Sequence, residues 1–287
     1  MKPGLECGVC LLGWVYGRAT AQNGSRDIPE LFKNILHFIS AEITATSNLA
    51  LLCNRSVDLI YEFVTPESDF WRDFKKGANT NALRLLGPAW DYIEKGETTK
   101  KRFERACFLA AAANVAPIGV PSGAFTFPDA AGIMDGRLVP PVVMGGAFEA
   151  AQKAKRVFYV TDNAGEVGFD SLLIRILKEM GSKVTLAIKE PAFFEDATTE
   201  DAIFFGLDGM ADEVVAVDKV FVPGRNATRA EQAFRESDLL VVKGTGNYES
   251  LMDEGHGKKA IYLLKIKCNV LARHTGIEKG GFLVRVA

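Results

Sequence analysis

The sequence predicts an α/β protein in which a mainly parallel sheet carries helices on both faces. Two observations support this. From Arg156 onward, short runs rich in β-branched and aromatic residues alternate with segments whose apolar residues recur at helical spacing. Before that point, from about Ile28 to Ala116, only the helical spacing recurs. Because strands that alternate with helices form parallel sheets, we expect a helical region followed by an α/β region.

The length of the chain favours two lobes. It has 287 residues, 48% of them hydrophobic, which is enough for a sizeable core. The segment from Pro117 to Gly146 is rich in Gly and Pro and predicts a loop-rich connection, either a lobe boundary or a lid over a cleft. We therefore place a mainly helical lobe at 1–150 and an α/β lobe at 151–287.

Charge and cysteine content indicate which kinds of binding partner and which cellular compartment to expect. The chain has 34 Lys and Arg against 36 Asp and Glu, so nothing favours nucleic acid or an anionic membrane as a partner, and a small molecule is expected. The five cysteines are an odd number without the spacing of a disulfide framework, which fits a reducing cytoplasm. Oligomeric state cannot be deduced from these features.

The N-terminus loosely resembles a signal peptide, but three residues argue against one. Glu6 precedes the apolar run from Val9 to Val15, Gly13 interrupts it and Arg18 follows it. The segment also contains a C-x-x-C pair, Cys7 and Cys10, for which packing is the favoured interpretation and a metal or redox role the alternative. We expect a cytoplasmic protein.

The individual elements can be placed in order along the chain. Helices are expected within 28–116, with Lys75 and Lys76 on a solvated face and Pro117 ending the last of them. Strands are then expected at 157–160, 183–189, 214–217, 239–243, 260–265 and 282–286. Helices are expected after the first of these strands, after the turn at 190–201, and at 227–236.

Polar side chains follow several of these strands. Since the carboxyl ends of parallel strands meet at one edge of a sheet, these side chains should lie close together. They are Asp162 and Asn163, Asp196, the turn from Lys243 to Asn247, and Lys265 with Lys267. For Asp162 and Asn163 the alternative is a cap on the following helix. Asn114 is a polar residue in an apolar run and either faces the site or caps its helix.

This set of side chains suits phosphoryl transfer. Two carboxylates and a carboxamide are oxygen donors for a divalent cation such as Mg²⁺, Mn²⁺ or Co²⁺. The turn Lys243-Gly244-Thr245-Gly246 offers backbone N–H groups and a cation for a phosphate. A metal beside an anion site supports chemistry that depends on positioning and on charge neutralisation.

Several familiar phosphate-binding motifs are missing. The sequence contains no G-x-x-x-x-G-K-[ST], and no G-x-G-x-x-G follows the strand at 157–160. A D-x-D motif of the haloacid dehalogenase type is also excluded at this strand, because Ala164 stands two places after Asp162.

Three motifs together resemble one family, the metal-dependent damage-control phosphatases, also catalogued as domain of unknown function 89. The motifs are Asp162-Asn163-Ala164-Gly165-Glu166, the segment from Pro191 to Asp196, and Lys243-Gly244-Thr245-Gly246-Asn247-Tyr248-Glu249. The C-x-x-C pair and Lys267-Cys268 resemble its archaeal and bacterial branch. The resemblance covers almost the whole chain.

The resemblance implies a fold and a site. It implies a helical lobe capping a Rossmann-like lobe, and a divalent ion (Mn, Co, Ni or Mg) held by Asp162, Asn163 and Asp196. It also implies that Lys267 binds phosphate and that Asn114 is the helical-lobe asparagine. Two departures concern substrate choice: the segment around Asn114 lacks the family's glycine and acid, and Glu195 stands where many relatives carry Asn.

We therefore expect a metal-dependent phosphatase that acts on small phosphorylated metabolites, with sugar phosphates as one class. Lys243 and Lys267 would neutralise charge, and Asp162 would be a ligand, a nucleophile or a base. Glu166 would support the site or be a solvated carboxylate at a helix start. The alternatives are an S-adenosylmethionine-dependent carboxyl methyltransferase and a non-catalytic protein that binds a metal or metabolite.

Overall fold

The computed structural model describes residues 1–21, 27–65, 68–117, 119, 123–252 and 255–287. Its centre is a seven-stranded sheet in the order β1-β7-β6-β5-β2-β3-β4. The strands are β1 (Val143–Met144), β2 (Arg156–Val160), β3 (Lys183–Lys189), β4 (Glu213–Val217), β5 (Leu239–Lys243), β6 (Lys259–Lys265) and β7 (Phe282–Val286). All neighbouring strands pair in parallel except β6 and β7. The predicted mainly parallel α/β fold is confirmed.

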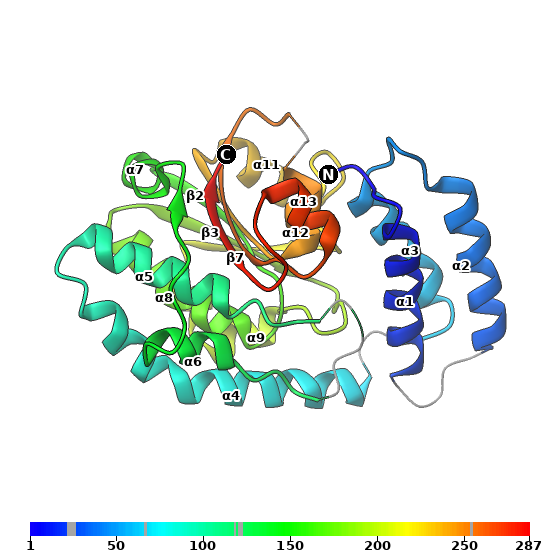
Figure 1. Ribbon diagram of the computed structural model, residues 1–287, viewed down its shortest axis with the longest axis horizontal. Coiled ribbons are helices and arrows are strands. Elements are labelled where there is room, and N and C mark those ends of the chain that lie inside the picture. Colours follow the sequence, from blue (N-terminus) through cyan, green and yellow to red (C-terminus); the bar gives the residue numbers. More distant parts are fainter. Residues whose placement is uncertain (22–26, 66–67, 118, 120–122, 253–254) are drawn as a thin grey trace.

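The helices form two layers on the sheet and a separate group at one end (Figure 1). The end group is α1 (Cys7–Thr20), α2 (Ile28–Glu42) and α3 (Leu49–Tyr61). One layer is α4 (Asp69–Glu94), α5 (Thr99–Ala112), α6 (Pro128–Met134), α7 (Ala147–Lys153), α8 (Glu166–Glu179), α9 (Thr199–Phe204) and α10 (Leu207–Met210). The other is α11 (Thr228–Glu236), α12 (Thr245–Leu251) and α13 (Asn269–Thr275).

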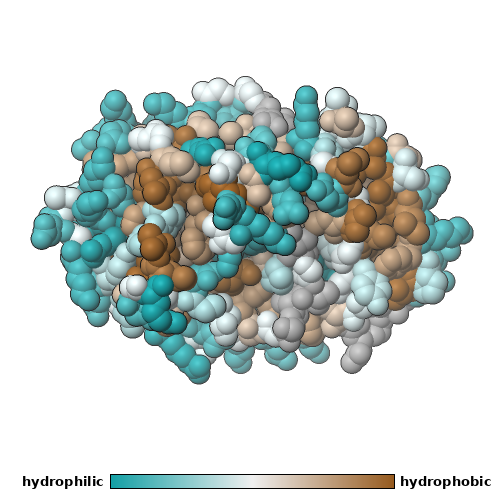
Figure 2. Space-filling model, viewed as in Figure 1, coloured by the Kyte–Doolittle hydropathy of each residue, from teal (hydrophilic) through white to brown (hydrophobic). Residues whose placement is uncertain are grey.

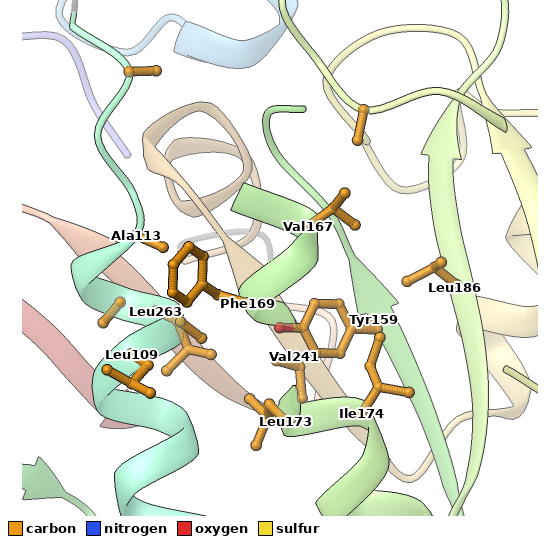
Figure 3. Packing of buried hydrophobic residues seen from close by; sticks show 14 of the residues in the cluster. Leu109, Ala113, Tyr159, Val167, Phe169, Leu173, Ile174, Leu186, Val241 and Leu263 are labelled. Carbon is orange, nitrogen blue, oxygen red and sulfur yellow. The ribbon is translucent and has the colours of Figure 1, made fainter. Parts of the chain in front are cut away.

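Alternation along the strands gives each layer its own core. Tyr159 and Val241 face α5 and α8, where Leu109 and Leu173 pack against them (Figure 3). The residues that alternate with them, such as Phe158 and Leu240, belong to the second core under α11 to α13. Burial of both sheet faces explains why these strands are almost continuously apolar.

The N-terminal half does more than cap the sheet. Its helices α4 and α5 share one hydrophobic core with the strands, and β1 pairs with β7 before the expected boundary near residue 150. The two-lobe division stays a prediction. The segment from Pro117 to Gly146, expected as loops, also contains α6.

Some sequence expectations were wrong in detail. Lys75 is buried and pairs with Asp201 at 3.0 Å, so it does not lie on a solvated face, whereas Lys76 is exposed. The apolar run near the N-terminus is part of helix α1. The expected turn after β5 is mostly the first turn of α12, which begins at Thr245. In the described part of the chain, no helix has both the length and the apolar character that crossing a membrane requires.

Candidate active site

The candidate site lies at the topological switch point of the sheet, where the strand order reverses. Strand β2 has β3 on one side and β5 on the other, so the connections that leave β2 and β5 run to opposite sides of the sheet. In doubly wound sheets, a crevice for ligands opens at this position. The predicted residues Asp162 and Asn163 follow β2, and Gly244 follows β5.

Backbone pairing brings Asp196 to this point. Asn163 and Asp196 form an isolated antiparallel bridge. On either side of the bridge, the Ala164 N–H donates to the Glu195 carbonyl and the Ala197 N–H donates to the Asp162 carbonyl, both at 2.9 Å. Side chains far apart in sequence are thus held together by main-chain hydrogen bonds rather than by their own contacts.

A cavity of about 210 Å³ opens over these residues. Asp162, Asn163 and Asp196 line it, together with Lys267 and the start of α12 at Thr245, Gly246 and Asn247. The structure therefore brings together most of the predicted site residues. Within the described residues, no three His, Cys, Asp or Glu side chains are close enough to form a metal site by themselves. The Asn163 side chain lies on the same cavity as the two carboxylates.

A network of amides fixes the Asp162 carboxylate. Its Oδ2 accepts from Asn114 Nδ2 at 2.8 Å and from Asn163 Nδ2 at 2.9 Å. The same two amide nitrogens donate to Glu166 Oε2 and Oε1, at 2.9 and 2.8 Å respectively. Asn114 is fully buried and accepts from the Lys265 N–H at 3.2 Å. Asn114 thus supports the carboxylates from below and is not among the residues that line the cavity.

Glu166 is a buried member of the site and not a solvated carboxylate. Burial and the neighbouring Asp162 raise its pKa to about 7, although Lys243 and Lys267 oppose the shift. Burial raises the pKa of Asp196 well above its usual range, although Lys189 opposes the shift, with Nζ 3.7 Å from the carboxylate. Two carboxyl groups that resist ionisation without a further cation are typical of functional sites.

The two predicted lysines have different surroundings. Lys243 is fully buried beneath the carboxylates and does not line the cavity: its Nζ donates to the Ala110 carbonyl at 2.7 Å and lies 3.0 Å from Asp170. Burial alone would lower its pKa, but Asp170 and Glu166 outweigh burial and raise it. Lys267 does line the cavity, and burial lowers its pKa.

Lys265 was expected beside Lys267, but the structure places it elsewhere. Its ammonium pairs with Asp129 of α6, and it lines a separate cavity next to that helix. Only one of the two lysines therefore reaches the main cavity. Residues two apart in a strand share a face, but β6 ends at Lys265, so this rule does not apply to Lys267.

Two glycines let the chain pass close to the carboxylates. Gly244 has φ +79°, and a Cβ there would lie 1.9 Å from Asp162 Oδ2. Gly165 has φ +77°, and a Cβ there would lie 2.8 Å from the Ala78 carbonyl of α4. Asn79, also on α4, accepts from the Gly165 N–H at 2.7 Å. The long helix α4 thus fixes the turn that carries Asp162.

Three further charged residues line the cavity; Glu195 was noted from the sequence as a departure from the family pattern, but none of the three was predicted as a site residue. Lys189 ends β3, Glu195 precedes Asp196, and Arg18 comes from α1. All three are buried, and Arg18 forms an ion pair with Glu195. Arg18 follows the apolar run that loosely resembles a signal peptide, and its contact with Glu195 joins parts of the chain 177 residues apart. Cys7 and Cys10 also line the cavity as free thiols.

Comparisons with known proteins agree with the motifs. A damage-control phosphatase of Archaeoglobus fulgidus is 28% identical over 291 residues, covering 100% of this chain and 99% of that protein. A damage-control phosphatase of Pyrococcus horikoshii is 34% identical over 139 residues, which is 47% of this chain and 48% of that protein. The crystal structure of a DUF89 family protein from Pyrococcus horikoshii has a TM-score of 0.72 at 23% identity, covering 99% of this chain and 98% of that one. Residues 6–283 match the damage-control phosphatase ARMT1-like domain, and the chain belongs to this family.

Proposed function

We propose that this chain is a metal-dependent phosphatase that hydrolyses small phosphate monoesters. Family membership supports a phosphatase activity. One observation supports the metal and the site: Asp162, Asn163 and Asp196 line a single cavity, which Lys267 also lines. Oxygen donors beside a cation are the groups that phosphoryl transfer needs.

The donor set fits a hard or borderline divalent ion, for which Mn²⁺, Co²⁺, Ni²⁺ and Mg²⁺ are the candidates. Asp162, Asn163 and Asp196 would hold it. When bound, the ion would neutralise charge on the phosphoryl oxygens and polarise the ester. The raised pKa of Asp196 supports this assignment, because its buried carboxylate lacks enough positive charge around it.

The chain's own residues then have distinct roles. Lys267, with Thr245, Gly246 and Asn247 at the start of α12, binds the phosphate from the cavity wall. Asn114 and Glu166 orient Asp162 and Asn163 through the amide network. Lys243 neutralises Glu166 and Asp170 from below, so it is a positioning residue and does not touch the substrate.

The size of the cavity restricts the substrate. At about 210 Å³ it is smaller than the roughly 300–1,000 Å³ typical of pockets for drug-sized ligands. A small monoester therefore suits it better than the bulky cofactor that a methyltransferase would require. Sugar phosphates are the substrate class suggested by the sequence, and the panel of phosphate monoesters used to test the proposal should include them.

The test is metal-restored turnover. Protein stripped with a chelator should be inactive on a panel of phosphate monoesters, and adding back Mg²⁺, Mn²⁺, Co²⁺ or Ni²⁺ should restore hydrolysis with at least one ion. Asp162→Asn should abolish the restored activity, whereas Asp208→Asn, at an exposed position on α10, should leave it unchanged. Full activity in the stripped protein or in Asp162→Asn would disprove the proposal.

A further inference from the structure

The cavity has two chemically different sides. We call the first the floor; it consists of Asp162, Asn163, Lys189, Asp196, Asn247 and Lys267. The second, the cap wall, consists of Cys7, Cys10, Leu11, Trp14, Leu49 and Cys53. The cap wall comes entirely from α1 and α3, the helices at the end of the sheet (Figure 1). Its positions on α1 are three or four residues apart, so they form one face of that helix.

The cap wall offers little to a polar ligand. Its polar atoms are the three thiols and the Trp14 indole N–H. Burial raises the pKa of Cys10 to about 12 and also raises that of Cys7, so these groups are neutral thiols, which are weak hydrogen-bond donors. Of the charged residues next to the cap wall, Arg18 pairs with Glu195 and Glu6 lies 3.0 Å from Arg273. Glu249 of α12 also lines the cavity on this side, where burial raises the pKa of its carboxyl group to about 7.

Several polar atoms that are buried and lack a hydrogen-bond partner lie on the floor or next to it. Among the described residues that line the cavity, the buried side-chain atoms without a hydrogen-bond partner are Arg18 Nε, Lys189 Nζ, Glu195 Oε2, Thr245 Oγ1 and Asn247 Oδ1. They lie on or next to the loops that follow β3 and β5, where Arg18 reaches Glu195. They can therefore serve the charged end of a substrate.

Trp14 makes the cap wall rigid. The Arg18 guanidinium stacks on its ring at 4.1 Å, and Phe194 meets it edge-on at 5.7 Å between centroids. Phe193, which also lines the cavity, lies 6.2 Å from the same ring. A fixed aromatic and aliphatic surface of this kind binds apolar groups at low entropic cost.

From this contrast, and resting on the phosphatase function proposed above, we infer that the substrate is a phosphate monoester whose organic part is apolar, an alkyl or aryl group, rather than a polyhydroxylated sugar. The phosphate would bind at the floor and the organic group would lie against the cap wall. A hydroxyl group buried there without a hydrogen-bond partner weakens binding, whereas each buried methylene group strengthens it.

A matched pair of substrates tests this inference. In both cyclohexylmethyl phosphate and glucose 6-phosphate, the phosphate is attached to a CH₂ group that projects from a six-membered ring. The two esters differ in the ring oxygen and the hydroxyl groups of the sugar. With the metal-loaded protein, we expect kcat/KM to be at least tenfold higher for the carbocyclic ester. Equal values, or a preference for the sugar, would overturn the inference while leaving the phosphatase function intact.

Binding provides a readout that needs no turnover. Calorimetry should show that cyclohexylmethylphosphonate binds more tightly than the phosphonate analogue of glucose 6-phosphate. If no ester is hydrolysed but this order holds, the phosphatase proposal fails while the preference of the cavity stands. The reverse order would overturn the preference.

Variants on one helix locate the effect. Leu11→Asn, nearly isosteric, should reduce the preference at least fivefold, mainly through a higher KM for the carbocyclic ester, and Cys10→Ser should act in the same direction. Val9 is 76% exposed on the opposite side of α1, so Val9→Asn is the control and should change nothing. Hydrophobic surface is also visible over the group of helices at the end of the sheet (Figure 2). A Val9→Asn effect equal to that of Leu11→Asn would contradict the inference.

Discussion

The floor and the cap wall are held in place by different forces. On the floor, Asp162 and Asn163 are fixed by hydrogen bonds whose lengths lie near 2.9 Å, supported from beneath by the buried ion pair of Lys243 and Asp170. The cap wall is held by apolar and aromatic packing among α1, α2 and α3. Hydrogen bonds are directional, whereas packing tolerates exchange of similar side chains. Chemistry should therefore depend on the floor, and substrate choice on the cap wall.

Gly244→Ala should give the largest effect, because it acts on the floor directly. The new Cβ would lie 1.9 Å from Asp162 Oδ2, and the alanine would have to keep the backbone angle φ of +79°. We expect kcat/KM to fall at least 100-fold as the carboxylate is displaced. Gly136 also has φ +79°, but a Cβ there meets nothing within 4 Å, so Gly136→Ala carries the backbone strain alone and should keep its activity.

Replacing Lys243 and Lys267 by methionine, one at a time, should distinguish a lysine that stabilises the fold from one that binds the substrate. Lys243→Met leaves Asp170 and Glu166 buried without their cation, so we expect the free energy of unfolding to drop by about 3–5 kcal/mol. Lys267→Met removes a charge from the cavity wall and should raise KM while leaving the urea midpoint nearly unchanged. Equal losses of stability in the two variants would mean that the two lysines have the same structural role.

The ion pair of Arg18 and Glu195 links the two regions, since one partner lies on α1 and the other next to Asp196. Arg18→Met leaves a buried carboxylate unpaired and should lower stability by about 3 kcal/mol. Adding Glu195→Gln should restore part of that loss. A double-mutant cycle in urea measures the coupling, and strictly additive losses would show that the pair does not join the regions.

Much of the sheet, and the residues at the carboxyl ends of its strands, could be predicted because the sequence patterns that indicate them are local. The runs that form β3 and β5 were placed with the correct ends, and the rule for carboxyl ends of parallel strands brought Asp162 near Asp196. Both predictions depend on patterns within about ten residues and on one topological rule.

The rest depended on contacts across the fold. Lys243 and Lys267 look alike in sequence, and only the position of α5 and Asp170 buries the first of them. Asn79 and Lys75 sit in a polar stretch of α4, yet both bond to Asp201 across more than 120 residues. No window along the chain contains both partners of such a pair.

The smallest expected effect concerns Glu249, which lines the cavity beside the thiols of the cap wall. Burial raises its pKa from 4.5 to about 7, so between these values the folded protein binds more protons than the unfolded chain. Stability should therefore decline as the pH rises from about 4.5 to 7. In Glu249→Gln this component disappears, so the difference in melting temperature between variant and parent should increase with pH over that window. Parallel melting curves for the two proteins across the window would show that Glu249 ionises as freely in the folded protein as in water.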